Sequence, residues 1–157
     1  MSQSNPPVHP NDLNQMPGHG IRRLQQIAVA LFAQEMGALG LTPVQFAVLQ
    51  ALEAQPGMDQ KTLAHRVSFD TSTIGAVIDR LESRELLTRN LSSEDRRVRL
   101  LHLTPAGIQH LHEAMPAVLR TQERILEPLT DEERLQFAQL LRKLCDDSRL
   151  QVNVRCA

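Results

Sequence analysis

The sequence predicts a mainly α-helical fold with a small β-hairpin wing, a winged helix-turn-helix with N- and C-terminal dimerisation helices. Aromatic residues make up only 3% of the chain, so its core has to be built from aliphatic side chains, as in helix-on-helix packing. Apolar residues recur at helical spacing along most of the 157 residues. The pattern changes to short β-type runs at residues 86–90 and 98–103, on either side of a charged loop.

The N-terminal part of the chain predicts an arm and two helices. Residues 1–15 are polar and rich in proline, and we expect a flexible arm there. An apolar face over residues 18–39 predicts a first helix that ends at Gly40. The letters TPVQ at 42–45 are a strong helix start, because they combine a threonine cap, a first-turn proline and a glutamine three residues after the cap. This second helix is expected to end near Ala54.

A helix-turn-helix is expected next. A short helix capped by Asp59 leads through a tight turn at residues 68–70 to a helix that begins near Thr71. Two helices joined by such a turn form a motif whose second member can enter the DNA major groove. Gly75 within this second helix is explained equally well by a close approach to DNA or by close helix packing. The helix carries an apolar stripe of Ile74, Val77, Ile78 and Leu81.

The C-terminal third predicts two more helices. Thr104 and Pro105 start a long helix, which Pro116 should kink by removing a backbone donor, and Thr130 forms a capping box with Glu133 for the last helix. The first and the last two helices are long and apolar but lie outside the helix-turn-helix, so we expect them to pack in a two-fold homodimer. The expected organisation is an arm (1–15), one domain (16–148, with a winged helix-turn-helix at about 42–104 and dimerisation helices at about 18–39 and 105–147) and a C-terminal tail (149–157).

The charged residues are distributed unevenly along the chain. Residues 60–103 carry eight basic and six acidic side chains, and seven of the eight bases are arginine, although the whole chain has a net charge of −1. An arginine-rich segment favours binding to nucleic acid. Recognition of single strands or RNA relies on aromatic stacking, which this composition does not support, so double-stranded DNA is the expected partner.

Several function classes lack their sequence signals. There is no glycine-rich phosphate loop, nucleophile elbow or metal-ligand spacing, so we expect no enzymatic activity, cofactor or metal. The two cysteines are too few for a disulfide framework, and we expect Cys145 to be buried on a helix and Cys156 to lie loose in the tail. No apolar run approaches the roughly 20 residues of a membrane span, and no secretory signal is apparent, so we expect a cytoplasmic protein without membrane contact.

The predicted recognition helix offers candidate DNA contacts. Thr71, Ser72 and Thr73 lie at its start, where hydroxyls and backbone N–H groups can meet phosphates or base edges, or simply cap the helix. Arg80 and Arg84 are four residues apart and off the apolar stripe. They either reach phosphates or form a solvated, salt-bridged face with the neighbouring acids.

Several short motifs follow one another in a specific order: Leu63-Ala64, Asp70 to Ile74, Val77 to Glu82, Leu87, Arg89, Asp95-Arg96-Arg97, Leu101, Leu103-Thr104 and Gly107. In this order they resemble the MarR family of bacterial regulators, over about residues 19–145. The wing motif Asp-Arg-Arg, followed by Leu-Thr-x-x-Gly, is the most specific part of the resemblance. The letters GHGIRRLQQ at 18–26 further resemble a proteobacterial subgroup that includes repressors of nicotinate catabolism.

The resemblance implies that the wing contacts DNA. Arg97 at the wing tip would enter the narrow minor groove, whose negative potential favours arginine, and Asp95 would orient its guanidinium. Arg89, Arg96 and Arg99 would add phosphate contacts. The alternative for this run is a solvated turn of mixed charge.

The resemblance also implies a repressor that a small aromatic carboxylate releases from its operator, through a pocket between the dimerisation helices and the DNA-binding lobe. His19, Arg22 and Arg23 offer an anion site at the start of the first helix, and exposed surface contacts are the alternative for them. Without Trp or Tyr to stack on the ligand, a nicotinate-like or benzoate-like acid is the expected effector. Two other functions stay open: a thiol redox-sensing regulator of the same fold, and a winged-helix protein-interaction module.

Overall fold

The computed structural model describes residues 12–147 and has the fold class that the sequence predicts. Residues 1–11 of the expected arm, and the whole expected tail with Cys156, lie outside the described residues. The elements, in chain order, are η1 (Leu13–Gln15), α1 (Pro17–Met36), η2 (Gly37–Leu39), α2 (Pro43–Ala54), β1 (Met58–Asp59), α3 (Gln60–Arg66), α4 (Thr71–Ser83), β2 (Leu87–Leu91), β3 (Arg99–Leu103), α5 (Pro105–Leu126) and α6 (Asp131–Cys145).

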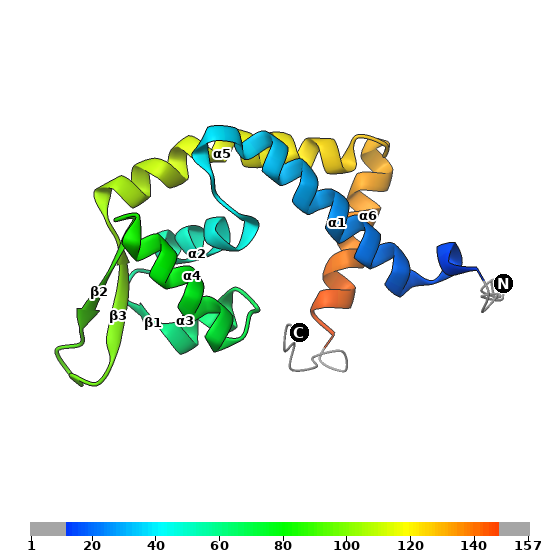
Figure 1. The fold of residues 1–157 in the computed structure, drawn as a ribbon. Helices are drawn as coiled ribbons and strands as arrows, with labels where there is room; N and C mark the ends of the chain where they lie inside the picture. Colours follow the sequence, from blue (N-terminus) through cyan, green and yellow to red (C-terminus); the bar gives the residue numbers. More distant parts are fainter. Residues whose placement is uncertain (1–11, 148–157) are drawn as a thin grey trace.

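The helices form a lobe and an extension. Helices α2, α3 and α4 pack with the sheet into the lobe, whereas α1 and α5 run side by side away from it (Figure 1). Most of the fully buried side chains belong to the lobe: Leu49, Leu52, Leu63, Ile74, Ile78, Leu81, Leu87 and Leu101 are all less than 2% exposed. The helix-turn-helix therefore has its own aliphatic core, as the low aromatic content predicts.

The sheet has three antiparallel strands in the order β1-β3-β2. Leu87 of β2 pairs with Leu103 of β3, and Arg89 pairs with Leu101, so β2 and β3 form the predicted wing. Strand β1 was not expected, and it pairs Met58 with Leu101 on the other edge of β3. The chain reaches this position through Gly57, whose φ of +81° places it in the left-handed region that favours glycine.

The helix starts confirm the capping motifs read from the sequence. Thr42 accepts a hydrogen bond from the Gln45 N–H, and the Gln45 side chain accepts one from the Thr42 N–H. Thr130 and Glu133 form the same capping box at α6. The first helix ends earlier than expected, at Met36, because the chain tightens into η2 before Gly40. Helix α5 continues as one helix through Pro116.

The start of α5 is packed closely against the turn that follows α4. The Thr104 hydroxyl donates to the carbonyl of Glu85 (2.7 Å) and accepts from the N–H of Gly107 (2.9 Å), while the Thr104 N–H donates to the carbonyl of Leu86 (3.1 Å). A Cβ atom on Gly107 would lie only 1.9 Å from the Leu86 carbonyl oxygen. Only glycine leaves room for this approach, so the glycine of the wing motif has a packing role.

Ion pairs join α1 to α5 in the extension. Glu35 of α1 accepts hydrogen bonds from Arg120 (2.8 Å) and Arg124 (2.9 Å) of α5. These bonds lower the pKa of the Glu35 carboxyl below its ordinary value, and the bond from Arg120 has the larger effect. These contacts hold the two long helices alongside one another.

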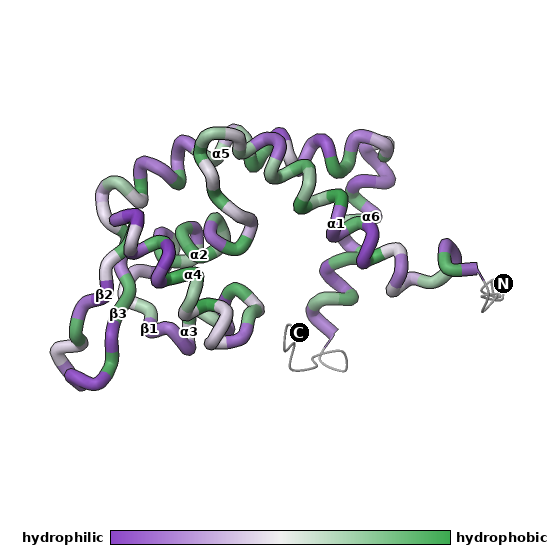
Figure 2. Tube along the Cα trace, viewed as in Figure 1, coloured by the Kyte–Doolittle hydropathy of each residue, from purple (hydrophilic) through white to green (hydrophobic). Residues whose placement is uncertain are grey.

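Helix α6 has an apolar face that the described chain does not cover. None of its residues is buried, and Figure 2 shows hydrophobic residues recurring along it. The expectation that Cys145 is buried is wrong for the single chain, because the thiol lies on this uncovered helix and is exposed. The large exposed apolar side chains of α6 are Leu135 (68% exposed), Leu140 (54%), Leu141 (47%) and Leu144 (54%).

Within residues 12–147, no single helix is long and apolar enough to cross a membrane. Residues Pro17–Leu39 and Pro43–Ala54, bent by 70° relative to one another, pass the same test as a pair, by length and composition only. Six residues of α2 in that pair are buried in this fold.

Candidate nucleic-acid interface and ligand pocket

Asp70 organises the start of α4. Its carboxylate accepts hydrogen bonds from the N–H of Thr73 (2.8 Å) and from the hydroxyls of Ser72 (2.5 Å) and Thr73 (2.6 Å). Asp70, rather than Thr71, is therefore the N-cap residue of α4. The Ser72 hydroxyl first, and then Thr73, hold the pKa of Asp70 well below its ordinary value. The hydroxyl protons of Ser72 and Thr73 point to Asp70, while Thr71 is exposed at the first helical position.

Helix packing accounts for Gly75. Gln60 of α3 lies across α4 and donates from its Nε2 to the carbonyl of Thr71 (2.9 Å). A Cβ atom on Gly75 would lie 3.0 Å from that Nε2 atom, which is tighter than most real contacts. The structure thus shows a close contact with a side chain of the neighbouring helix, and a close approach to DNA at Gly75 stays a prediction.

The wing tip presents an exposed arginine that one carboxylate holds. Asp95 accepts from the backbone N–H of Arg97 (3.0 Å) and from its Nε (3.2 Å) and Nη2 (3.4 Å). These bonds lower the pKa of Asp95, and the bond from the backbone N–H has the larger effect. The carboxylate therefore stays ionised at neutral pH. The Arg97 side chain is 91% exposed. The positive charge is therefore oriented and fully accessible at the end of the hairpin.

Arg80 on α4 and Arg96 in the wing loop are also exposed. No hydrogen bond or ion pair joins either guanidinium to another residue of the described chain. Arg99 on β3 is exposed as well, so Arg80, Arg96, Arg97 and Arg99 give the recognition helix and wing four exposed arginines.

The structure gives Arg89 and Arg84 different contacts from those expected. Arg89 is only 18% exposed and pairs with Asp79 and Glu82 of α4, so its charge is compensated within the lobe. Arg84 donates to backbone carbonyls of the segment between α1 and α2. In the DNA-free chain both guanidinium groups are bound to protein oxygens, so a phosphate contact by either arginine stays a prediction.

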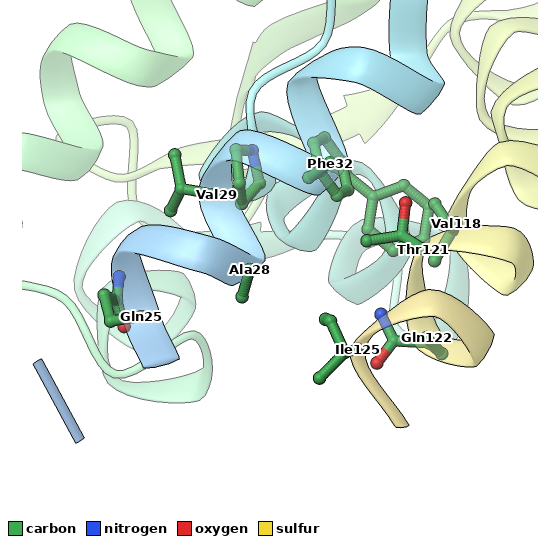
Figure 3. Close-up of a pocket in the computed structure, with 10 residues that line it drawn as sticks. Gln25, Ala28, Val29, Phe32, Val118, Thr121, Gln122 and Ile125 are labelled. Carbon is green, nitrogen blue, oxygen red and sulfur yellow. The ribbon is translucent and has the colours of Figure 1, made fainter. Parts of the chain in front are cut away.

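A pocket with a volume of about 320 Å³ lies between α1, α5 and the start of α2. This is at the small end of the range for ligand pockets. Its wall contains uncharged polar groups from Gln25, Thr121 and Gln122, and in Figure 3 Gln122 and Ile125 reach from α5 toward α1. The Phe32 and Phe46 rings also line it, with centroids 6.3 Å apart. The lining residues are Gln25, Ala28, Val29, Phe32, Pro43, Phe46, Val118, Thr121, Gln122 and Ile125.

Sequence reasoning missed these pocket residues. The signal that could have found them is a polar residue placed within an apolar stripe. Thr121 and Gln122 interrupt the stripe between Val118 and Ile125, and Thr121 is 1% exposed with its hydroxyl donating to the carbonyl of Ala117 (2.8 Å).

The three residues expected to bind an anion lie outside this pocket. Arg22 is exposed, donates to the Gln26 side chain (3.3 Å) and lies 3.4 Å from His19 Nδ1. Arg23 is directed to another side and donates to Asn14 (3.4 Å). Arg22 is three residues before Gln25, hence on the same side of α1 and about 4.5 Å along the axis. Of the three, Arg22 shares its helix face with the pocket wall.

Comparison with known proteins identifies the family. Residues 41–98 match the model of the MarR family. The transcriptional repressor NicR of Pseudomonas putida is 31% identical over 137 residues, which cover 87% of this chain and 87% of the repressor. The chain belongs to the MarR family. The resemblance read from the wing motif is therefore confirmed.

Further MarR-type relatives cover nearly the whole chain. A protein described as regulating the hcr operon of Thauera aromatica is 36% identical over 140 residues, covering 88% of this chain and 84% of the relative. The solved structure of Bordetella bronchiseptica BpsR, whose DNA binding is regulated by 6-hydroxynicotinic acid, superposes with a TM-score of 0.84 at 33% identity, covering 89% and 100% of the two chains. These relatives are transcriptional regulators rather than enzymes. The similarity to NicR and BpsR supports the subgroup resemblance of residues 18–26.

Proposed function

We propose that this MarR-family regulator binds a double-stranded operator as a homodimer, represses transcription there and is released by a small aromatic carboxylate. The observation that carries the DNA part is the wing tip, where Arg97 is 91% exposed and Asp95 holds its guanidinium. A solvated turn of mixed charge has no need for an oriented cation. The narrow minor groove attracts such an arginine, while the start of α4 contacts the adjacent major groove.

Within each half-site, Thr71, Ser72 and Thr73 approach DNA at the N-terminus of α4. Arg80, Arg96 and Arg99 contact phosphates. Two symmetric copies place their recognition helices about 34–36 Å apart, which is one turn of DNA.

The dimer follows from the apolar face of α6. Leu140, Leu141 and Leu144 lie on one side of this helix of 15 residues, and each is about half exposed in the single chain. Exposed apolar patches of this kind mark interaction sites, and a second copy of the same helices buries them in a two-fold arrangement. Cys145 lies at the end of the same helix.

For the effector, we propose that its ring enters the pocket between Phe32 and Ile125, with its carboxylate at Arg22 near the pocket mouth. No charged residue lines the pocket, whereas a carboxylate is held best by a guanidinium. Gln25 and Gln122 supply neutral donors and acceptors for a ring hydroxyl or ring nitrogen. This polarity favours a hydroxypyridine carboxylate over a purely hydrocarbon ring. His19 and Arg23 complete the charged end of α1.

The DNA part is tested by fluorescence anisotropy with an operator duplex selected from randomised DNA. Arg97→Ala should weaken binding by about tenfold or more and reduce discrimination at an A·T-rich flank. The matched control is Arg142→Ala, which removes the same charge from α6. Within residues 12–147, the Arg142 guanidinium bonds only to the carbonyl of Ala138 in its own helix. Equal losses for the two variants would show a non-specific charge effect and contradict the wing assignment.

The salt dependence provides a second measure of the same interface. With Arg84 and Arg89 bound to protein oxygens, Arg80, Arg96 and Arg99 provide about three phosphate contacts per half-site, or about six per dimer. The log–log slope of affinity against salt should then be about −5. A slope shallower than about −2 would mean that the arginines do not release counterions on binding.

The effector part is tested by titrating aromatic acids against the protein–operator complex. Nicotinate, 6-hydroxynicotinate, benzoate and 4-hydroxybenzoate form the panel. Arg22→Ala should raise the concentration needed for release by about tenfold, since a bound carboxylate loses a charge-assisted hydrogen bond. Arg23→Ala, which alters the neighbouring position directed toward Asn14, should change it less. If no acid releases DNA, or Arg22→Ala responds as the unaltered protein does, the site is wrong.

A further inference from the structure

The C-terminal end of the recognition helix is tied to a distant segment of the chain. Helix α4 ends at Ser83, and the left-handed backbone of Glu85 (φ +58°) turns the chain there. Between them, Arg84 donates from Nη1 to the carbonyl of Gly40 and from Nη2 to that of Leu39, both at 3.2 Å. These two partners lie 44 and 45 residues earlier in the sequence, in the connection between α1 and α2.

Helix α5 reaches the same point through His110. Its Nε2 lies 3.0 Å from the Leu39 carbonyl oxygen and 3.2 Å from Arg84 Nη2. A carbonyl oxygen has two lone pairs, so it accepts from both side chains when the imidazole carries its proton on Nε2. We refer to Arg84, His110 and the carbonyls of Leu39 and Gly40 as the Arg84 cluster.

The connection held by this cluster leads directly into the pocket wall. Gly40 adopts the left-handed conformation (φ +59°), and the capping box of Thr42 fixes the following residues to the start of α2. Pro43, the first residue of α2, lines the pocket. On α5, Val118 lines the same pocket and lies eight residues beyond His110, or about 12 Å along the helix. The two helices α2 and α5, which both line the pocket, are therefore each connected to the C-terminal end of the recognition helix.

We propose that Arg84 is a positioning residue that transmits occupation of the pocket to the recognition helix; this inference rests on the proposed effector response. A ring between α1, α5 and α2 displaces Pro43 relative to α5, and the carbonyls of Leu39 and Gly40 move with the short connection. Because Arg84 holds these carbonyls, the C-terminal end of α4 moves too. The occupied form then fits the operator less well, and its affinity falls by the differential affinity of the ligand for the two forms.

The test separates transmission from binding. Arg84→Met keeps the side-chain length but removes the donors, Arg84→Lys keeps the charge with a single donor group, and Gln109→Met is the control. Gln109 precedes His110 on α5, and its side chain contacts Glu113 of the same helix. For each protein, operator affinity is measured with and without saturating 6-hydroxynicotinate. Calorimetry gives the affinity of the DNA-free protein for the same probe, and thermal unfolding confirms that each variant is folded.

We expect 6-hydroxynicotinate to weaken operator binding of the unaltered protein by about fivefold or more, which is within the usual range of allosteric coupling. In Arg84→Met the ratio of the two operator affinities should fall below about twofold, while the affinity for the probe stays within about twofold of the original. Arg84→Lys should give an intermediate ratio, and Gln109→Met the original one. If Arg84→Met does not fold, the reduced ratio of Arg84→Lys carries the same comparison.

Two results would overturn the inference alone. A ratio unchanged in Arg84→Met, with operator affinity lowered equally in both conditions, would make Arg84 a phosphate contact. If neither the ratio of operator affinities nor the operator affinity itself changes in Arg84→Met, the Arg84 cluster has a structural role only and transmits nothing. If the probe has no effect on operator binding by the unaltered protein, the proposed effector response fails for this acid, and the inference fails with it. The unaltered protein thus distinguishes the two failures.

Discussion

Replacing Gly107 by alanine is the sharpest test of how the wing is attached to α5. Alanine is a better helix former than glycine by about 1 kcal/mol, so helix propensity alone predicts stabilisation. The new Cβ would lie 1.9 Å from the Leu86 carbonyl oxygen, whereas ordinary van der Waals contact begins near 3.4 Å. The backbone must therefore separate by about 1.5 Å at a joint that holds three hydrogen bonds.

The magnitude follows from these contacts. Overpacking costs about 1–3 kcal/mol, and each hydrogen bond lost at the joint adds about 0.5–1.5 kcal/mol. Allowing for the gain in helix propensity, Gly107→Ala should lower the free energy of unfolding by about 3 kcal/mol. In a protein of this size, that corresponds to a fall in Tm of about 6–12 °C. Thermal unfolding followed by far-UV circular dichroism measures this change. One protein concentration is used throughout, because the proposed dimer would contribute to stability.

Gly75→Ala is the matched control, because it also places alanine within a helix. Its Cβ would meet only the end of the flexible Gln60 side chain, at 3.0 Å, which can move aside at the cost of one exposed hydrogen bond. The free energy of unfolding should stay within about 1 kcal/mol of the original. A Tm for Gly107→Ala equal to or above that of the unaltered protein would refute the steric reasoning.

Two other predictions concern the apolar face of α6 and the N-terminal cap of α4. Leu140→Glu places a charge among Leu140, Leu141 and Leu144 of α6, and it should shift the proposed dimer to monomers in sedimentation at micromolar concentration. Gln139→Glu, which is directed away from these three leucines, should leave the dimer intact. Equal behaviour of the two variants would exclude this face from the interface. The folded-state pKa of Asp70 lies below its ordinary value, so its ionised form stabilises the fold above about pH 4, and this contribution is lost as the pH falls further. The Tm of the unaltered protein should therefore fall more steeply below about pH 4 than that of Asp70→Asn, and parallel profiles would contradict the capping role.

The features that the sequence predicted are those with a local signal. The two capping boxes, the apolar stripe of α4 and the two wing strands each depend on residues within one turn or one hairpin. Strand β1 was missed because two residues, Met58 and Asp59, are too few to show a period of two. Its formation depends on the edge of β3, which comes about 40 residues later in the chain.

The arginines show the same distinction at the candidate site. The bond between Asp95 and Arg97 spans two residues and could be expected from the motif. The ion pairs of Arg89 were missed because Asp79 and Glu82 lie on the preceding helix. Two acids three residues apart that face a following strand are nevertheless a signal that the sequence contains. Nothing local indicates that Arg84 contacts carbonyls more than 40 residues away. Cys145 was expected inside because apolar helices usually pack within their own chain, whereas α6 does not.

The short strand β1 has a consequence for how an operator is chosen. It pairs with one edge of β3 while β2 pairs with the other, and the start of α5 is bonded to the turn that follows α4. Arg89 of β2 also pairs with Asp79 and Glu82 of α4. The wing is therefore fixed relative to α4, and in the proposed complex the distance between them spans two adjacent grooves. An operator then has to present a narrow minor groove at a fixed distance from the major groove that α4 enters. Base steps that narrow the minor groove at that distance should be selected even where no side chain touches a base edge.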